Sequence, residues 1–297
     1  MFREITGGAT LLRVICLVAV VAGSVLFVAV PAWASIDLGN AGDYGLVDLG
    51  NGTTLAINSG PISGGNPGGV LVGNGVTVNL SGGNNGGIPN GLYTDGTANI
   101  SGNLQNPFST FTVPTSYTQS ALLSAQNAST QAAALPATQT FTTITSTTTI
   151  SGNGGLNVID VGSIQNAPLT ISGGPSDRFI INVSGSFQTN QPMTLSGVTA
   201  SQVLFNFTGT SGHVLQTSGG DVLYGTFLAT DGGQFQFSEL DLTGALINTD
   251  GNVQFVSGSQ LTYAPFSTIP EPATIVVWSL LGGLAIAAGW WRKRNAA

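Results

Sequence analysis

Two carboxylates and one histidine are the residues of this sequence whose types and spacing could do chemistry. Glu239 and Asp241 stand two positions apart, which places both side chains on one face if the segment is a strand. A pair of carboxylates is what glycoside hydrolysis requires. His213 would be the base of a Ser-His-Asp triad, but it lies in a Ser-Gly-His turn and no serine has an elbow motif. Because no aromatic or basic partner converges on the pair, we interpret it as a solvated strand edge and predict no enzyme activity.

The body of the chain, residues 35–269, is acidic and almost without basic residues. Arg178 is its only Lys or Arg, against eleven Asp and Glu. A polysaccharide lyase needs a basic group for proton abstraction, so this composition disfavours that class. A lysine-free negative surface also excludes nucleic acid as a partner. The turn at 173–177 is similar to one calcium-binding nonapeptide repeat but occurs once, so we predict no metal site and no cofactor.

Short apolar segments separated by Gly and Asn turns must position these residues. Four such segments, at 179–183, 203–207, 224–228 and 245–247, recur about every twenty residues, and each is followed by a turn and a second alternating strand. A repeat of this length indicates a mostly β fold, a right-handed β-helix-like solenoid over 35–262 in which stacked rungs share one core. A β-sandwich, whose strands recur about every 8 to 12 residues, is the alternative.

One segment breaks the strand pattern. Its apolar residues fall at spacings of three or four, as on one face of a helix: Tyr117, Ala121, Ala125, Ala128, Ala132 and Leu135. We predict a lateral α-helix over 116–135, with Thr115 or Ser116 as its N-cap and Pro136 as its stop. The alanine stripe predicts close packing along the side of the solenoid.

The N-terminus is typical of a signal peptide over residues 1–34. Arg3 and Arg13 precede an apolar stretch, and Ala32 and Ala34 form an A-x-A site that predicts cleavage before Ser35 by signal peptidase. Cys16, the only cysteine, lies inside this segment. The mature chain therefore has no thiol or disulfide chemistry.

The C-terminus contains three dissimilar elements in order. A linker over 263–272 ends in Pro270, Glu271 and Pro272, and an uncharged apolar run over 273–291 is long enough for a transmembrane helix. The tail over 292–297 begins with a basic cluster that predicts a cytoplasmic end: Arg292, Lys293 and Arg294. This order resembles the PEP-CTERM sorting signal of Gram-negative bacteria that make exopolysaccharide.

The body resembles the choice-of-anchor A family of exported bacterial proteins. The resemblance rests on the order of seven short motifs: DLGNA at 37–41, VLVG at 70–73, ALPA at 134–137, GLNV at 155–158, FIINVSG at 179–185, VLFNF at 203–207 and GALI at 244–247. Together with the tail, it implies transient anchoring in the inner membrane, processing by an exosortase-like sorting enzyme, and a place at the cell surface or in the extracellular matrix. It implies no catalytic residues.

The order of elements in this chain, strands followed by an inserted helix and then further rungs, is also similar to that of bacterial and algal ice-binding solenoids. Such proteins need Thr at the same place in each rung, whereas here a local run holds most of it: Thr142, Thr143, Thr145, Thr147, Thr148 and Thr149. Another residue recurs instead and predicts a stacked amide ladder: Gln188, Gln216, Gln236 and Gln254.

Three functional hypotheses follow from these patterns. The main one is a non-enzymatic surface or matrix protein associated with exopolysaccharide, biofilm or adhesion, with polysaccharide as a partner. The alternative is an ice-binding solenoid. The third is a carbohydrate-active β-helix enzyme that uses Glu239 and Asp241.

Overall fold

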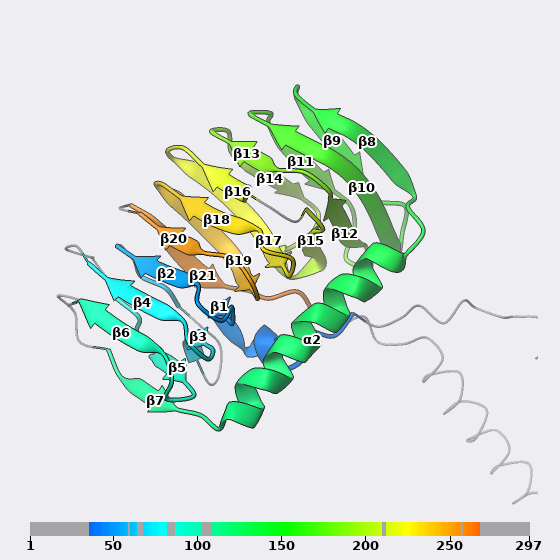
Figure 1. Cartoon of the computed structure of the whole chain (residues 1–297). Coiled ribbons are helices and arrows are strands. Elements are labelled where there is room, and N and C mark those ends of the chain that lie inside the picture. Colours follow the sequence, from blue (N-terminus) through cyan, green and yellow to red (C-terminus); the bar gives the residue numbers. More distant parts are fainter. Residues whose placement is uncertain are drawn as a thin grey trace, which may run out of the picture. The chain divides into compact units, whose positions relative to one another are not determined.

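The computed structural model describes residues 36–58, 60–63, 68–81, 87–102, 108–209, 212–256 and 258–267. These residues belong to one compact unit, Ile36–Ile269. Every strand pair in it is parallel, which confirms the solenoid and excludes the β-sandwich, whose sheets are antiparallel. Successive turns of the chain stack three sets of strands, and each set forms one face (Figure 1).

The first face, called the covered face, is the longest. Its strands, in spatial order, are β8 (Gln139–Ile144), β10 (Leu156–Gln165), β12 (Arg178–Val183), β15 (Val203–Phe207), the second half of β17 (Asp221–Ala229), the second half of β19 (Leu240–Asn248), β1 (Tyr44–Asp48), β3 (Gly68–Val72), β5 (Leu92–Thr94) and β7 (Thr110–Thr112).

The second face, called the amide face, continues from the end of β10. Its further strands are β13 (Phe187–Thr189), β16 (His213–Thr217), β18 (Gln234–Phe237), β20 (Val253–Phe255), β2 (Thr54–Ile57), β4 (Thr77–Leu80) and β6 (Asn99–Gly102). On the third face lie the three-stranded sheet β9 (Thr148–Ser151), β11 (Leu169–Ser172) and β14 (Met193–Ser196), and the paired stretch of β17, β19 and β21 (Gln260–Tyr263).

The spatial order of the rungs differs from their order in the sequence. Strand β1 pairs with β19 on one side and β3 on the other, with Leu46 opposite Leu246 and Val70. The first rung of the chain therefore stacks on the last one, and β7 and β8 lie at opposite ends (Figure 1). Chain order alone gives no sign of this, because each rung has the same apolar pattern.

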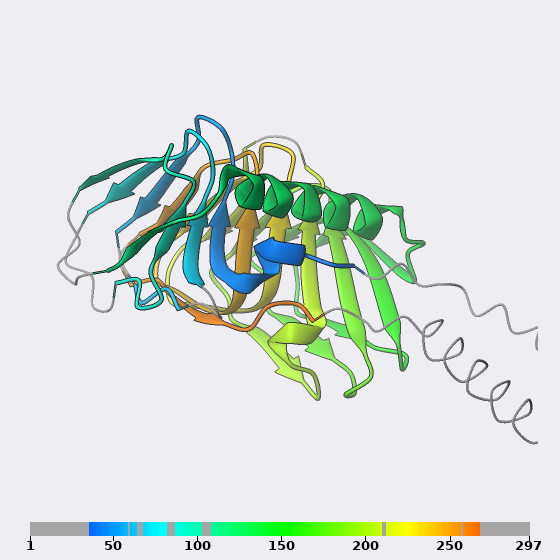
Figure 2. The same ribbon diagram turned by 90° about the horizontal axis from the view of Figure 1, so that it is seen from below.

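The helix α2 (Thr115–Ala134) connects these two ends and lies across the strands of the covered face (Figure 2). Twenty residues span about 30 Å, enough to cross several strands. The predicted stripe is confirmed, since Ala121, Ala125, Ala128 and Ala132 are buried. The predicted N-cap is wrong: Pro114 is the N-cap and gives no side-chain hydrogen bond, and the helix begins and ends one residue earlier than predicted.

The interior of the solenoid is filled by side chains that alternate with outward-facing ones. Phenylalanines on neighbouring rungs stack there, and the rings of Phe205 and Phe227 lie 4.8 Å apart. Gly225 and Gly244, both at positive φ, mark the corner where β17 and β19 pass from the third to the covered face. A Cβ atom at Gly244 would collide with the carbonyl oxygen of Gly225, so the corner requires glycine.

The predicted linker over 263–272 begins too early. Tyr263 is the last residue of β21 and its hydroxyl donates to the carbonyl of Gly42 at 2.6 Å. Phe266 is buried beneath the covered face's apolar cluster, and the Ser267 N–H donates to the carbonyl of Ser201. Residues 263–267 therefore belong to the solenoid, because a buried aromatic ring stabilises their docking.

No helix within the described residues is long and apolar enough to span a membrane. The predicted signal peptide (1–34), membrane helix (273–291) and tail (292–297) lie outside the described residues. The same holds for their functional residues: Ala32, Ala34, Ser35, Pro270, Glu271, Pro272, Arg292, Lys293 and Arg294.

Candidate binding surface

The amide face carries an outward row of eight registered positions, of which seven are polar and one is alanine. The row is in register from end to end, in the order Gln165, Gln188, Gln216, Gln236, Gln254, Ala56, Asn79 and Ser101. The predicted ladder of four glutamines is thus confirmed, and Gln165 extends it. At a strand spacing of about 4.8 Å, the row is roughly 34 Å long.

Two pairs of neighbouring side chains in this row are joined by hydrogen bonds. The Gln216 Nε2 donates to Gln236 Oε1 at 3.3 Å, and the Ser101 hydroxyl donates to Asn79 Oδ1 at 2.7 Å. The six row residues between the two end positions each lie between two buried residues, as Gln236 does between Phe235 and Phe237. The row therefore stands on a packed sheet, which holds its side chains at a fixed spacing.

The strands that carry the row are without Asp, Glu, Lys or Arg, apart from β10. Amide groups cost less to strip of water than charged groups do, and each offers both a donor and an acceptor. The face is therefore suited to an uncharged partner that also donates and accepts hydrogen bonds.

The third face carries a smaller grid of hydroxyl groups that the sequence interpretation missed. Thr149, Thr170 and Thr194 are in register on β9, β11 and β14, and two positions on, a second row is formed by Ser151, Ser172 and Ser196. All six side chains are exposed or half-buried. Thr149 thus does have equivalents on neighbouring rungs, although the grid spans three rungs only.

The residues with possible catalytic chemistry are not brought into a catalytic arrangement. Glu239 lies at positive φ in the turn between β18 and β19, whereas Asp241 points outward from β19 beside Val222 and Gln260. His213 is exposed at the start of β16 and lies opposite Gln234. The guanidinium of Arg178 donates to the carbonyls of Pro175 and Asp177, far along the chain from both carboxylates.

Asp177 belongs to the turn at 173–177, which is similar to one calcium-binding repeat, and its carboxylate has a structural role. Its Oδ1 accepts from Gly154 N, Gly155 N and Asn157 Nδ2 at 2.8–3.0 Å, and its Oδ2 accepts from Gly174 N at 2.7 Å. Donors, led by the Gly174 and Gly155 N–H groups, hold the pKa of Asp177 well below its usual range. The carboxylate therefore ties two neighbouring turns together. Among the described residues, no group of three His, Cys, Asp or Glu is placed to hold a metal ion.

Two other carboxylates lie inside the solenoid. Burial raises the pKa of Asp48 to about 7, against the opposing hydrogen bonds from Thr53 and from the Gly50 N–H. Burial likewise raises the pKa of Asp221 to about 6, against the N–H groups of Ser218 and Gly219. Each has one oxygen without a hydrogen-bond partner, Asp48 Oδ2 and Asp221 Oδ1. Both are enclosed, so neither is accessible to a substrate.

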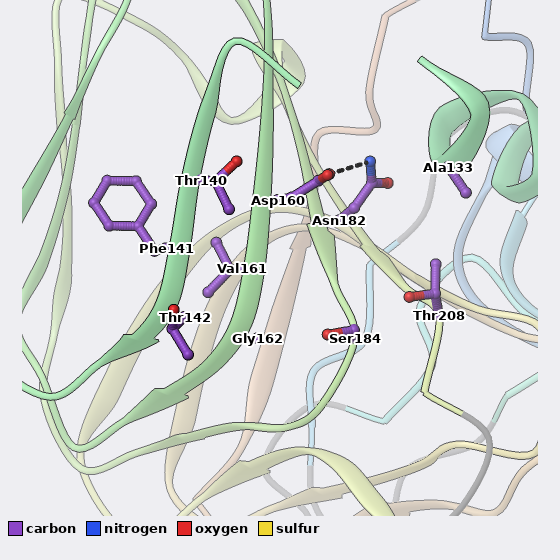
Figure 3. Close-up of a pocket in the computed structure, with 10 residues that line it drawn as sticks. All are labelled: Ala133, Thr140, Phe141, Thr142, Asp160, Val161, Gly162, Asn182, Ser184 and Thr208. Atoms are coloured by element: carbon purple, nitrogen blue, oxygen red, sulfur yellow. Dashed lines mark hydrogen bonds between the residues drawn. The ribbon is translucent and has the colours of Figure 1, made fainter. Parts of the chain in front are cut away.

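A separate hollow of about 380 Å³ lies where α2 ends over the covered face (Figure 3). Asp160, Asn182 and Ala133 are among the residues around it, and a hydrogen bond joins Asn182 Nδ2 to Asp160 Oδ1 at 3.1 Å. This hollow is on a different face from the amide row.

The comparisons agree with this architecture. Residues 37–247 match the family described as "Putative Ice-binding-like adhesive domain", and the chain belongs to this family. Two solved structures share its fold: an ice-binding protein from an Antarctic biological consortium (17% identity, TM-score 0.52, 77% of this chain and 92% of that one) and an ice-binding protein from an Arctic yeast (17% identity, TM-score 0.52, 80% and 97%). No curated protein matches the chain.

This family favours the ice-binding alternative over the matrix interpretation. The solved structures show the fold alone: parallel strands with one helix. The family's description is that of a binding domain and not of an enzyme.

Proposed function

We propose that this chain is an exported adhesive whose solenoid adsorbs to ice through the amide face. One observation carries the proposal: the outward row of eight registered positions on an uncharged, uncovered sheet. Its family supports an ice-binding-like adhesive role.

A protein surface with regularly spaced groups can make many contacts at once with a solid surface that is also periodic. Each amide or hydroxyl of the row makes a weak contact with a water or hydroxyl of the surface, because its bonds to bulk water are exchanged for similar ones. Because the sheet fixes all eight positions, later contacts cost little further ordering once the first have formed. Many weak contacts then sum to a slowly reversible attachment.

We assign ice binding to the amide face and not to the hydroxyl grid of the third face, because the amide row is longer. Thr149, Thr170 and Thr194 supply the methyl and hydroxyl groups suited to ordered water, but on three rungs. The amide row continues through rungs from both ends of the chain, from Gln165 to Ser101.

Partition of the purified mature chain into a slowly growing ice front tests this proposal. We expect enrichment in the ice over a non-binding protein of the same size, together with thermal hysteresis. The double variant Gln188→Lys/Gln254→Lys, at two exposed row positions, should lose most of that enrichment while unfolding at the same temperature. A wild-type chain that partitions like the reference protein would contradict the proposal.

The route to the surface is a further part of the proposal. The A-x-A site before Ser35 supports export, and the order of Pro270–Glu271–Pro272, apolar run and basic cluster supports sorting by an exosortase-like enzyme. Association with exopolysaccharide or biofilm follows from the same resemblance. Mass spectrometry of the native protein tests the route: a mature chain that starts at Ser35 and lacks Trp290 and Trp291 is expected, and an intact tail would contradict sorting by cleavage.

A further inference from the structure

A polar groove follows the C-terminal half of α2. It consists of the hollow of about 380 Å³ at the end of the helix and an adjoining hollow of about 600 Å³, which share Ala133 and Thr208 as lining residues. We call the two together the α2 groove. Each lies in the range of about 300–1,000 Å³ typical of ligand sites.

Hydroxyl groups line the floor of the groove at strand spacing. Val161, Val183, Phe207 and Ala229 are in register on successive strands and point into the core. The residue after each points outward, which gives a row that reads Gly162, Ser184, Thr208 and Thr230, with Thr142 beside Gly162. The positions of the row are about 4.8 Å apart. Thr230 is buried and its hydroxyl donates to Ser129 Oγ, so the hydroxyls open to the groove are those of Thr142, Ser184 and Thr208.

A chain of hydrogen bonds orients a carboxylate at one end of the groove. Asn206 Nδ2 donates to Asn182 Oδ1 at 2.9 Å, and Asn182 Nδ2 donates to Asp160 Oδ1 at 3.1 Å. The same two amides donate to the helix carbonyls of Ser129 and Ala132, so they cannot rotate away. Asp160 Oδ2 has no hydrogen-bond partner among the described residues, and in Figure 3 the carboxylate points toward Asn182 and the end of the helix.

The other side and the far end of the groove are polar as well. Gln126, Asn127 and Thr130 of α2 face the row of hydroxyls. Asp231 lies at the far end of the groove, just after β17, the third strand along from the strand of Asp160. Phe141 lines the first hollow by its backbone only, because its ring packs against the core on the other side of β8 (Figure 3).

These residues restrict the class of ligand. The groove has no Lys, Arg or His among its lining residues, so it offers nothing to a phosphate, sulfate or uronic acid. It presents no aromatic face to a nucleobase or a lipid tail. Hydroxyl, amide and carboxylate groups instead complement the hydroxyl groups of a neutral sugar, which both donate and accept.

We propose that the α2 groove binds a short stretch of a neutral linear polysaccharide, laid along the solenoid axis. A pyranose repeat is close in length to one strand spacing, so two neighbouring sugars meet the neighbouring hydroxyls of Ser184 and Thr208. Asp160 accepts hydrogen bonds from the hydroxyls of the sugar at one end. The inference does not depend on ice adsorption, because the groove and the amide face share no residue.

Calorimetric titration of the mature chain with cellotetraose, laminaritetraose and maltotetraose tests the proposal. At least one tetrasaccharide should bind, and the isosteric variants Asp160→Asn and Thr208→Val should each weaken that binding about tenfold. Thr243→Val, a half-buried threonine of the third face, is the matched control and should bind as the wild type does. Thermal unfolding of each variant checks that the fold is intact.

The proposal fails if no tetrasaccharide of the panel binds, or if Asp160→Asn and Thr208→Val bind as well as the control. A heat signal with calcium chloride alone that is lost in Asp160→Asn would also overturn it, since the carboxylate would then be a cation ligand. Ice partition separates the two proposals: Asp160→Asn should keep it, and Gln188→Lys/Gln254→Lys should keep saccharide binding.

Discussion

The covered face and the amide face are both built of stacked parallel strands, but their outward side chains differ: they are apolar on the covered face and polar on the amide face. On four consecutive rungs the covered face points Leu228, Ile247, Val47 and Leu71 outward, and all four are fully buried in one cluster with the alanines of α2. The amide face of the same rungs points out Gln236, Gln254, Ala56 and Asn79. Strand pairing sets the spacing of the outward side chains on both faces. These side chains are apolar where α2 covers them and polar where they face solvent.

The covered row itself changes where the helix ends. Beyond Leu228 the next outward positions are Asn206, Asn182 and Asp160, and their burial falls toward the end of α2 at Ala134. The polar end of the row thus lies where the helix no longer excludes water, and the α2 groove lies at this end of the helix.

The largest expected difference is between Ile247 and Gln254, which lie on the same rung. Ile247→Asp places a charge beneath α2 without a partner and should cost more than about 4 kcal/mol of unfolding free energy. Gln254→Asp, on the exposed row, should cost less than about 0.5 kcal/mol. Urea denaturation measures both, and equal losses would refute the distinction between the faces.

The two enclosed carboxylates, Asp48 and Asp221, should make the stability of the fold depend on pH. The folded pKa values of Asp48 and Asp221, about 7 and 6, lie above the usual value, so the folded chain binds more protons than the unfolded chain between about pH 4 and 7. Stability should therefore fall as pH rises through this range. Asp177 acts in the opposite sense, and its contribution is lost below about pH 4.

Thermal unfolding between pH 4 and 8 checks the sign. In Asp48→Asn the loss of stability with rising pH should be smaller than in the wild type, since the amide keeps the contacts to Thr53 and Gly50 without ionising. A wild-type stability that rises steadily from pH 4 to 8 would be contrary to the burial of these groups.

A smaller difference in unfolding free energy is expected between variants of two amide residues, Asn206 and Gln216, which each bond to an amide on the neighbouring strand. Asn206→Ala leaves the buried carbonyl of Ser129 and Asn182 Oδ1 without their donor and should cost about 1–3 kcal/mol. Gln216→Ala removes a half-buried ladder bond to Gln236 and should cost less than about 0.5 kcal/mol. Chemical denaturation of the two variants side by side decides whether coverage by α2, and not the ladder, sets the energy.

Local features of this fold could be predicted from the sequence. Short apolar segments between Gly and Asn turns located the strands at 179–183 and 203–207. The alanine spacing located α2, and the recurrence of Gln after an apolar residue located the amide row. These features depend on neighbours within one rung or on a repeat of nearly constant length.

Long-range features could not be predicted. The pairing of β1 with β19 joins two strands from opposite ends of the chain, and their apolar pattern is shared with the other rungs. The hydroxyl grid was missed because Thr149 stands in a local run of threonines, and nothing in that run marks it as the partner of Thr170 and Thr194. The linker was placed too early because Phe266 is a lone apolar residue whose burial depends on residues distant in the chain, such as Thr226, whose hydroxyl oxygen accepts from the Phe266 N–H.

Ice partition of two variant pairs tests the central claim most directly, that the open amide face is the binding face. Gln188→Lys/Gln254→Lys changes the amide row, and Thr149→Lys/Thr194→Lys makes the same change at exposed positions of the hydroxyl grid. We predict that the first pair abolishes most of the enrichment in ice and that the second leaves it near the wild-type value. The reverse result, loss in the second pair and retention in the first, would contradict the account.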